Sequence, residues 1–194
     1  TVAEVVINEL NADNPGGNDT QEYVELYGEP NASLDNLVIV FYGGSTGGSY
    51  AAFDLDGYST DANGFFVLGD TLTTNVDYMI TSATLQNGAD GVALFVGNGS
   101  DFPNTTQPTT HNLIDVMIYG TDDAPATLLI SGFGLDVMFP GYAQFNETVQ
   151  TAGLDLTQSR IPDGGPALSN YNVVLQALTP GTFNVNVSVS EVEG

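Results

Sequence analysis

The sequence predicts an all-β protein organised as an antiparallel β-sandwich. Short runs rich in Val, Ile, Tyr and Phe are bounded by Gly, Asn and Asp, which is typical of strands and turns. These runs recur along the 194-residue chain at regular spacing, whereas helical patterns are scarce. The hydrophobic fraction of 42%, with nine tyrosines and ten phenylalanines, is enough for one sizeable core.

The strand-like runs follow one another from the first residues almost to the end of the chain. The expected strands are VAEVVINEL (2–10), EYVELY (22–27), LVIVFYG (37–43), FFVLGD (65–70), GVALFVG (91–97), NLIDVMIYG (112–120) and YNVVLQAL (171–178). The best helix candidate is DDAPATLL (122–129), with Asp122 or Asp123 as the cap and Pro125 in the first turn.

The C-terminal segment has a pattern of its own. From Phe183 to Ser190, Phe and Val alternate strictly with Asn and Ser, after the turn signal Pro180-Gly181. We therefore expect a sandwich domain over residues 1–184 and an extension strand over residues 185–194. This strand could close a sheet of its own domain or pair with a neighbouring subunit.

The charge of the chain limits its partners. It has 24 acidic residues and a single basic one, Arg160, for a formal charge of −23. Self-repulsion at this density opposes compaction unless cations screen or bind. Nucleic acid is excluded as a direct partner, and an anionic membrane surface is disfavoured, because both are bound through Lys and Arg. The favoured partners are metal cations, neutral glycans and protein, including further copies of this chain.

The composition also points to a compartment. There is no cysteine, and no apolar run is long enough to span a membrane. A start at Thr1 suggests a mature secreted chain whose signal peptide has been removed, and the lack of lysine suits a marine or high-salt setting. The alternative is the cytoplasm of a salt-accumulating cell. Candidate glycosylation sites are Asn18, Asn31, Asn98, Asn104, Asn146 and Asn186.

The loop between the first two expected strands is the best candidate for a metal site. Asn11, Asp13, Asp19 and Glu22 offer oxygen ligands, which Ca²⁺ takes in sets of six to eight with irregular geometry. The twelve-residue spacing of an EF-hand is missing. The alternative is an Asx-rich turn whose side chains bond their own backbone.

A second acidic stretch, DLDGYSTDANG, holds Asp54, Asp56 and Asp61. On a strand, Asp54 and Asp56 would point to the same side, where like charges repel unless a cation such as Ca²⁺ bridges them. The alternative is a hairpin with turn-forming Asp and Asn. A third group, Asp122 and Asp123 with Asp115 upstream, is better explained by helix capping.

The remaining polar residues give little sign of catalysis. We expect Arg160 to form a structural ion pair, in bidentate geometry with an acid, and to fix its loop. His111 has no second histidine for a zinc site and no nucleophile at motif spacing. Phosphate loops, GxSxG elbows and HExxH motifs are absent from the sequence, so we expect no enzyme.

Several segments, taken in order, resemble the lamin tail domain family. They are VVINEL, QEYVELYG, SLDNLVIVFYGG, FDLDGYSTDANGFFVLGD, LQNGADGVALFVGNG, NLIDVMIYGTDDAPATLL, SRIPDGG and ALTPGTFN, spanning about Val5 to Asn184. The resemblance implies an immunoglobulin-like β-sandwich and, in secreted and bacterial members, an accessory or structural module without catalytic residues. The coiled coil, basic surface and prenylation motif of nuclear lamins are missing, so a nuclear role is not implied.

Two hypotheses about function follow. The first is a secreted, acidic, non-catalytic structural protein, stabilised by Ca²⁺, that forms filaments or a surface layer through terminal-strand exchange. The second is a Ca²⁺-dependent module of a secreted hydrolase or adhesin that binds glycan or matrix through loops and through Tyr42, Tyr50 and Tyr58.

Overall fold

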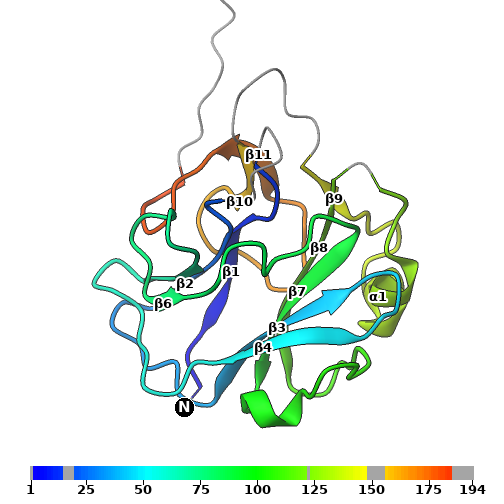
Figure 1. Ribbon diagram of the computed structural model, residues 1–194, viewed down its shortest axis with the longest axis horizontal. Coiled ribbons are helices and arrows are strands. Elements are labelled where there is room, and N and C mark those ends of the chain that lie inside the picture. The colour runs from blue at the N-terminus through cyan, green and yellow to red at the C-terminus, as the bar shows by residue number, and fades with distance from the viewer. Residues whose placement is uncertain (1, 15–19, 122, 148–155, 185–194) are drawn as a thin grey trace, which may run out of the picture.

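The protein is an all-β sandwich of two sheets, as the sequence predicts (Figure 1). The computed structural model describes residues 2–14, 20–121, 123–147 and 156–184. Strands of the six-stranded sheet lie in the order β11-β10-β1-β2-β5-β6, and strands of the five-stranded sheet in the order β4-β3-β7-β8-β9. Neighbouring strands are antiparallel except at two edges, where β6 and β9 run parallel to their neighbours.

The strand bounds are as follows. The six-stranded sheet contains β1 (Val5–Asn11), β2 (Tyr23–Gly28), β5 (Phe65–Gly69), β6 (Tyr78–Met79), β10 (Leu156–Arg160) and β11 (Val173–Ala177). The five-stranded sheet contains β3 (Leu37–Gly43), β4 (Ser49–Asp54), β7 (Asp90–Val96), β8 (Leu113–Gly120) and β9 (Phe145–Asn146). Each of the seven predicted runs overlaps one of these strands, and the runs do not predict β4, β6, β9 and β10.

Three short helices complete the fold: η1 (Gly99–Asp101), α1 (Thr127–Gly132) and α2 (Leu135–Met138). The predicted start of the first α-helix is wrong. Its N-cap is Ala126, which makes no side-chain cap bond, and the Ala126 N–H is satisfied by Gln144 Oε1 at 2.9 Å. Asp123 is therefore not the N-cap residue of this helix, and Asp122 lies outside the described residues. No helix in the described part of the chain is long and apolar enough to cross a membrane.

Two hydrophobic cores flank the five-stranded sheet. The first lies between the sheets, where Ile7 and Leu26 meet Phe41 and Leu94. The second lies on the outer face of the five-stranded sheet, which α1 and α2 cover with Leu129 and other apolar side chains. The outer face of the six-stranded sheet is different, because its buried side chains include carboxylates.

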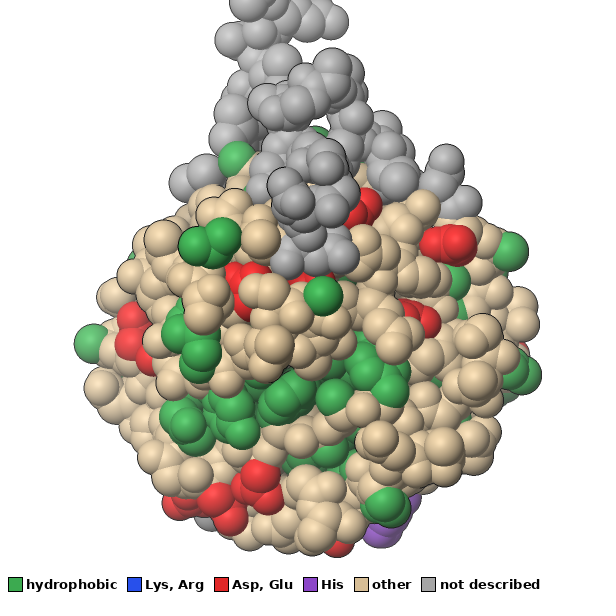
Figure 2. All heavy atoms as spheres, in the orientation of Figure 1, with side chains coloured by type: hydrophobic (Ala, Val, Ile, Leu, Met, Phe, Trp, Pro, Cys, Tyr) green, Lys and Arg blue, Asp and Glu red, His purple; other side chains and the backbone are tan. Residues whose placement is uncertain are grey.

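Acidic side chains lie at several places on the face shown in Figure 2, and none of the basic type is visible there. The reason is that Arg160 is fully buried. The surface therefore carries uncompensated negative charge, consistent with the sequence.

Candidate functional site

Arg160 forms the expected ion pair, and its partner is Asp115 of β8. The pair measures 3.0 Å between Arg160 Nη2 and Asp115 Oδ2, and neither side chain is exposed. Arg160 Nε also donates to Ile7 O at 2.7 Å, and the Ile7 N–H donates to Asp115 Oδ2 at 2.9 Å. The pair thus satisfies both backbone groups of Ile7 and ties the two sheets together.

The geometry of this pair differs from the expected bidentate fork. Both contacts to the carboxylate come from Nη2, at 3.0 and 3.3 Å, while Nη1 donates to Ser169 O at 2.7 Å. Burial raises the pKa of Asp115, against the lowering effect of Arg160 and of backbone N–H donors. The ion pair is accordingly a structural element that organises the loop after β10.

A carboxylate pair lies on the outer face of the six-stranded sheet. Glu9 of β1 and Glu25 of β2 are directly opposite in the strand register, and both are fully buried. The Tyr23 hydroxyl donates to Glu9, and Asn8 Nδ2 donates to Glu25 Oε1 at 2.8 Å. Burial raises the pKa of Glu9, and burial together with the nearby Glu9 charge raises the pKa of Glu25 well above its ordinary value.

These carboxylates hold the last described segment, Thr179–Asn184. Glu9 accepts from the Thr179 N–H at 2.9 Å and from its hydroxyl at 2.7 Å. Glu25 accepts from the Gly181 N–H at 2.6 Å, and Asp163 accepts from the Asn184 N–H at 3.1 Å. The carboxylates therefore serve as backbone acceptors that fix the point from which residues 185–194 continue.

Phe183 adds an apolar contact to this anchor. Its ring lies 5.1 Å from that of Phe65 and 6.3 Å from that of Tyr27, centroid to centroid. The side chain is nevertheless 52% exposed. Aromatic pairs at these separations stabilise by about 0.5–1.5 kcal/mol each.

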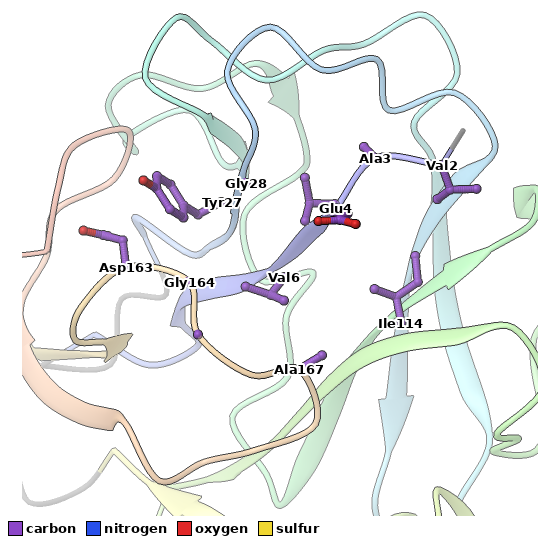
Figure 3. Close-up of a pocket in the computed structure, with 12 residues that line it drawn as sticks. Val2, Ala3, Glu4, Val6, Tyr27, Gly28, Ile114, Asp163, Gly164 and Ala167 are labelled. Carbon is purple, nitrogen blue, oxygen red and sulfur yellow. The ribbon is translucent and has the colours of Figure 1, made fainter.

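A groove of about 600 Å³ lies beside β1, next to Asp163. Figure 3 shows Val6, Ile114 and Ala167 around it, with Tyr27 and Asp163 at one end and Val2 at the other. Its lining is mainly aliphatic. This groove has no counterpart in the sequence prediction, because residues 163–167, β8 and the N-terminal residues meet there only in the folded chain.

The residues of the first predicted Ca²⁺ site lie in different surroundings. Asn11 and Glu22 are fully buried; Asn11 Nδ2 donates to Gln21 O at 2.9 Å, whereas Glu22 Oε2 accepts from the Leu85 N–H at 3.2 Å. Asp13 accepts from Asn87 Nδ2 at 3.2 Å, and Asp19 lies outside the described residues. Among the described residues, no group of three or more His, Cys, Asp or Glu side chains is placed to hold a metal ion.

Near this loop lies Glu147, a buried carboxylate that the sequence analysis does not single out. Its oxygens accept from the Ala12 N–H at 3.3 Å and from Gln158 Nε2 at 2.9 Å. Burial raises the pKa of Glu147 to about 8. In the sequence it is merely the middle residue of a candidate glycosylation motif, so only the fold reveals it.

The second acidic stretch forms turns. Asp54 Oδ1 accepts from the Asp56 N–H at 3.1 Å, and Asp61 Oδ1 accepts from the Asn63 and Phe65 N–H groups, each at 2.8 Å. The expectation that Asp54 and Asp56 share one side of a strand is wrong, because β4 ends at Asp54. These contacts are typical of Asx-rich turns, which was the alternative to a cation site.

The candidate glycosylation sites divide by exposure. Asn31, Asn98 and Asn104 are exposed, whereas Asn146 is half-buried in β9. Asn18 and Asn186 lie outside the described residues.

The tyrosines proposed for glycan binding lie in or against the cores. Tyr42 is fully buried, and Tyr50 and Tyr58 are partly buried and pack against the inter-sheet core. Their use as a sugar-binding surface is therefore not supported. His111 is exposed, as expected of a loop residue.

Comparison with known proteins gave no match: no family model, no curated protein and no solved structure matches the chain.

Proposed function

We propose that this chain is a non-catalytic structural module that assembles with copies of itself in a secreted, cation-rich setting. The observation that carries the proposal is the use of Glu9, Glu25 and Asp163 as backbone acceptors for the segment before the C-terminal extension. A site for acid–base catalysis needs carboxylates within reach of a substrate. These carboxylates instead bind the protein's own chain.

Terminal-strand exchange between copies would explain why residues 185–190 alternate Val with Asn or Ser. An extended segment that leaves one copy from an anchored point can add to a neighbour. Such a contact is heterologous, so it propagates into filaments when the rotation does not close a ring. The immunoglobulin-like topology and the lamin-tail relationship belong to the same proposal and rest on the ordered sequence resemblance.

The role of Ca²⁺ in the proposal is to reduce charge repulsion between copies. Copies with a formal charge of −23 repel one another, and divalent cations would reduce that repulsion. The glycan-binding alternative has less support, since its tyrosines belong to the cores and the described groove is mainly aliphatic.

Deletion of residues 185–194 tests the proposal. We expect the truncated chain to keep its thermal transition and β-type circular dichroism but to lose assembly, measured as particle mass by light scattering. A matched full-length pair is Val187→Pro, which removes a strand N–H donor, and Val187→Ile, which keeps the strand pattern. Assembly by the truncated chain or by Val187→Pro would refute strand exchange.

A further inference from the structure

A second cavity, of about 390 Å³, lies at one end of the five-stranded sheet. Three segments line it: the turn between β3 and β4, at Gly44 and Ser45, the loop that leads into β7, and the chain between β8 and α1 (Figure 1). Two of these segments contribute a carboxylate, Asp90 at the start of β7 and Asp123 before α1. Among the described residues, no Lys, Arg or His lines this cavity.

One of the two carboxylates has an oxygen that the fold does not use. Asp90 is 5% exposed, and its Oδ1 accepts from the Gly44 N–H at 2.7 Å. Its other oxygen, Oδ2, is buried, and none of the described residues donates a hydrogen bond to it. Buried polar atoms are nearly always bonded, so an unpaired one calls for a bound water or ion. Asp90 Oδ2 is therefore an unused acceptor at the wall of a cavity.

The electrostatic surroundings of Asp90 favour a cation over water. Burial raises the pKa of Asp90, the bond from the Gly44 N–H opposes this rise, and the charge of Asp123 adds to it. The hydroxyl of Tyr119, which lies opposite Asp90 in the strand register, donates to Gln86 O at 2.7 Å. The one basic side chain of the protein is buried in its ion pair elsewhere. A cation between the two carboxylates would turn their repulsion into attraction.

The segment that carries Asp123 is held in place by Gln144. Gln144 Nε2 donates to Asp123 O at 3.1 Å, and Gln144 Oε1 accepts from the Ala126 N–H at 2.9 Å. The Thr121 hydroxyl donates to Asp123 Oδ2 at 3.3 Å. Because Asp123 is itself exposed, its carboxylate can bind a partly hydrated ion at the mouth of the cavity. The two carboxylates thus differ, one buried and one in contact with solvent.

The ligand chemistry of the cavity selects Ca²⁺. Its lining offers carboxylate and backbone carbonyl oxygens without sulfur or imidazole. Ca²⁺ takes six to eight oxygen ligands in irregular geometry, whereas Mg²⁺ demands a near-ideal octahedron. A carboxylate turns easily about its terminal torsion, so Asp90 Oδ2 can turn toward an ion that enters from the cavity. With only two acidic side chains, the expected dissociation constant is on the order of 10⁻⁴–10⁻³ M.

We propose that Asp90 and Asp123 bind one Ca²⁺ ion in this cavity, together with backbone carbonyls and water. The ion would fix the chain before α1 against the start of β7 and would stabilise the folded state. The site lies within a single copy and needs no assembly, so this inference goes beyond the proposed function and does not depend on it.

Thermal unfolding of the full chain, followed by circular dichroism at constant ionic strength, tests the site. We expect Ca²⁺ at about ten times its dissociation constant to raise Tm by roughly 3–6 °C. Asp90→Asn keeps an oxygen that can accept from Gly44 but removes the charge, and it should lose most of this rise. The matched control is Asp136→Asn, an exposed position in α2 with the same change in net charge, which should keep the rise.

A second variant tests the position of the ion and leaves both carboxylates in place. Gly88 lines the cavity, and an added Cβ there would have only Asp90 Oδ1 within 4 Å, at a distance of 4.0 Å. Gly88→Lys brings an ammonium group beside the two carboxylates. This variant should unfold at a higher Tm than the wild type without Ca²⁺, and it should lose the response to Ca²⁺. Thr71→Lys, at an exposed position, makes the same change in net charge and should do neither.

Four results would overturn the proposal. A wild type that does not respond to Ca²⁺ would mean that water serves Asp90. Equal rises in Tm with Mg²⁺ and Ca²⁺ would indicate charge screening alone. A full response of both Asp90→Asn and Gly88→Lys would place the ion elsewhere. A rise that disappears at tenfold lower protein concentration would belong to assembly of copies, which is the proposed function, because binding within one copy does not depend on protein concentration.

Discussion

Replacement of Arg160 by methionine should be among the most destabilising single changes in this protein. Methionine keeps much of the side-chain volume but removes the charge and every donor. The Asp115 carboxylate would then be buried without its cation, and the carbonyls of Ile7 and Ser169 would lose their donors. Removal of one partner of a buried ion pair costs about 3–5 kcal/mol.

This magnitude is large relative to the roughly 5–15 kcal/mol by which most domains are stable. For a chain of this size it corresponds to a fall in Tm of roughly 6–20 °C. The assay is thermal and urea unfolding followed by circular dichroism. The control is Thr71→Glu, an exposed position, which makes the same one-unit change in net charge.

A second variant separates the cost of the unpaired Asp115 charge from the cost of the lost Arg160 packing. Asp115→Asn in the Arg160→Met background removes the buried charge, and we expect it to recover part of the lost stability. If Arg160→Met alone changes the free energy of unfolding by less than about 1 kcal/mol, the typical cost of a single point mutation, the assignment of this ion pair as the link between the sheets is wrong.

Two further predictions concern the buried carboxylates and the C-terminal anchor. Glu147 has a pKa raised from 4.5 to about 8, so between these values the folded state holds a proton that the unfolded state lacks. The contribution of Glu147 to the free energy of unfolding should fall as pH rises from 5 to 8, by about 1.4 kcal/mol per pH unit at most. In urea unfolding, Glu147→Gln should lose this part of the pH dependence. A pH dependence equal to that of the wild type would contradict the prediction. Gly181→Ala should destabilise by about 1–3 kcal/mol, since Gly181 has φ of 74° and an added Cβ would lie 2.6 Å from Asn75 Cβ. The control is Gly57→Ala: Gly57 has φ of 84°, and an added Cβ would have no atom within 4 Å, so this change measures the backbone cost alone. Equal destabilisation by the two changes in thermal unfolding would rule out the clash with Asn75.

The strands that contain apolar runs could be predicted from the sequence, whereas the strands without such runs could not be predicted. LVIVFYG matches β3 residue for residue, because a continuous apolar run ending at glycine is typical of a buried strand. The β10 sequence LTQSR is nearly all polar, yet Thr157 to Arg160 are buried. Their burial depends on partners elsewhere in the chain, which a local pattern cannot reveal.

The candidate site was predictable only in part for the same reason. Arg160 could be expected to pair, but Asp115 is 45 residues away in the sequence. The alternation in β1 and β2 places Glu9 and Glu25 on the sheet face that points away from the apolar core. From the sequence alone, this face would be expected to be exposed to solvent. The segment that covers them begins at Thr179, 170 residues after Glu9.

The central claim, assembly of this chain with itself, is tested most directly by the particle mass of the full-length protein. Light scattering would be recorded with millimolar Ca²⁺ and again after chelation. The account predicts particles much heavier than one chain that become smaller when the cation is removed. The mass of a single chain in both conditions would contradict it.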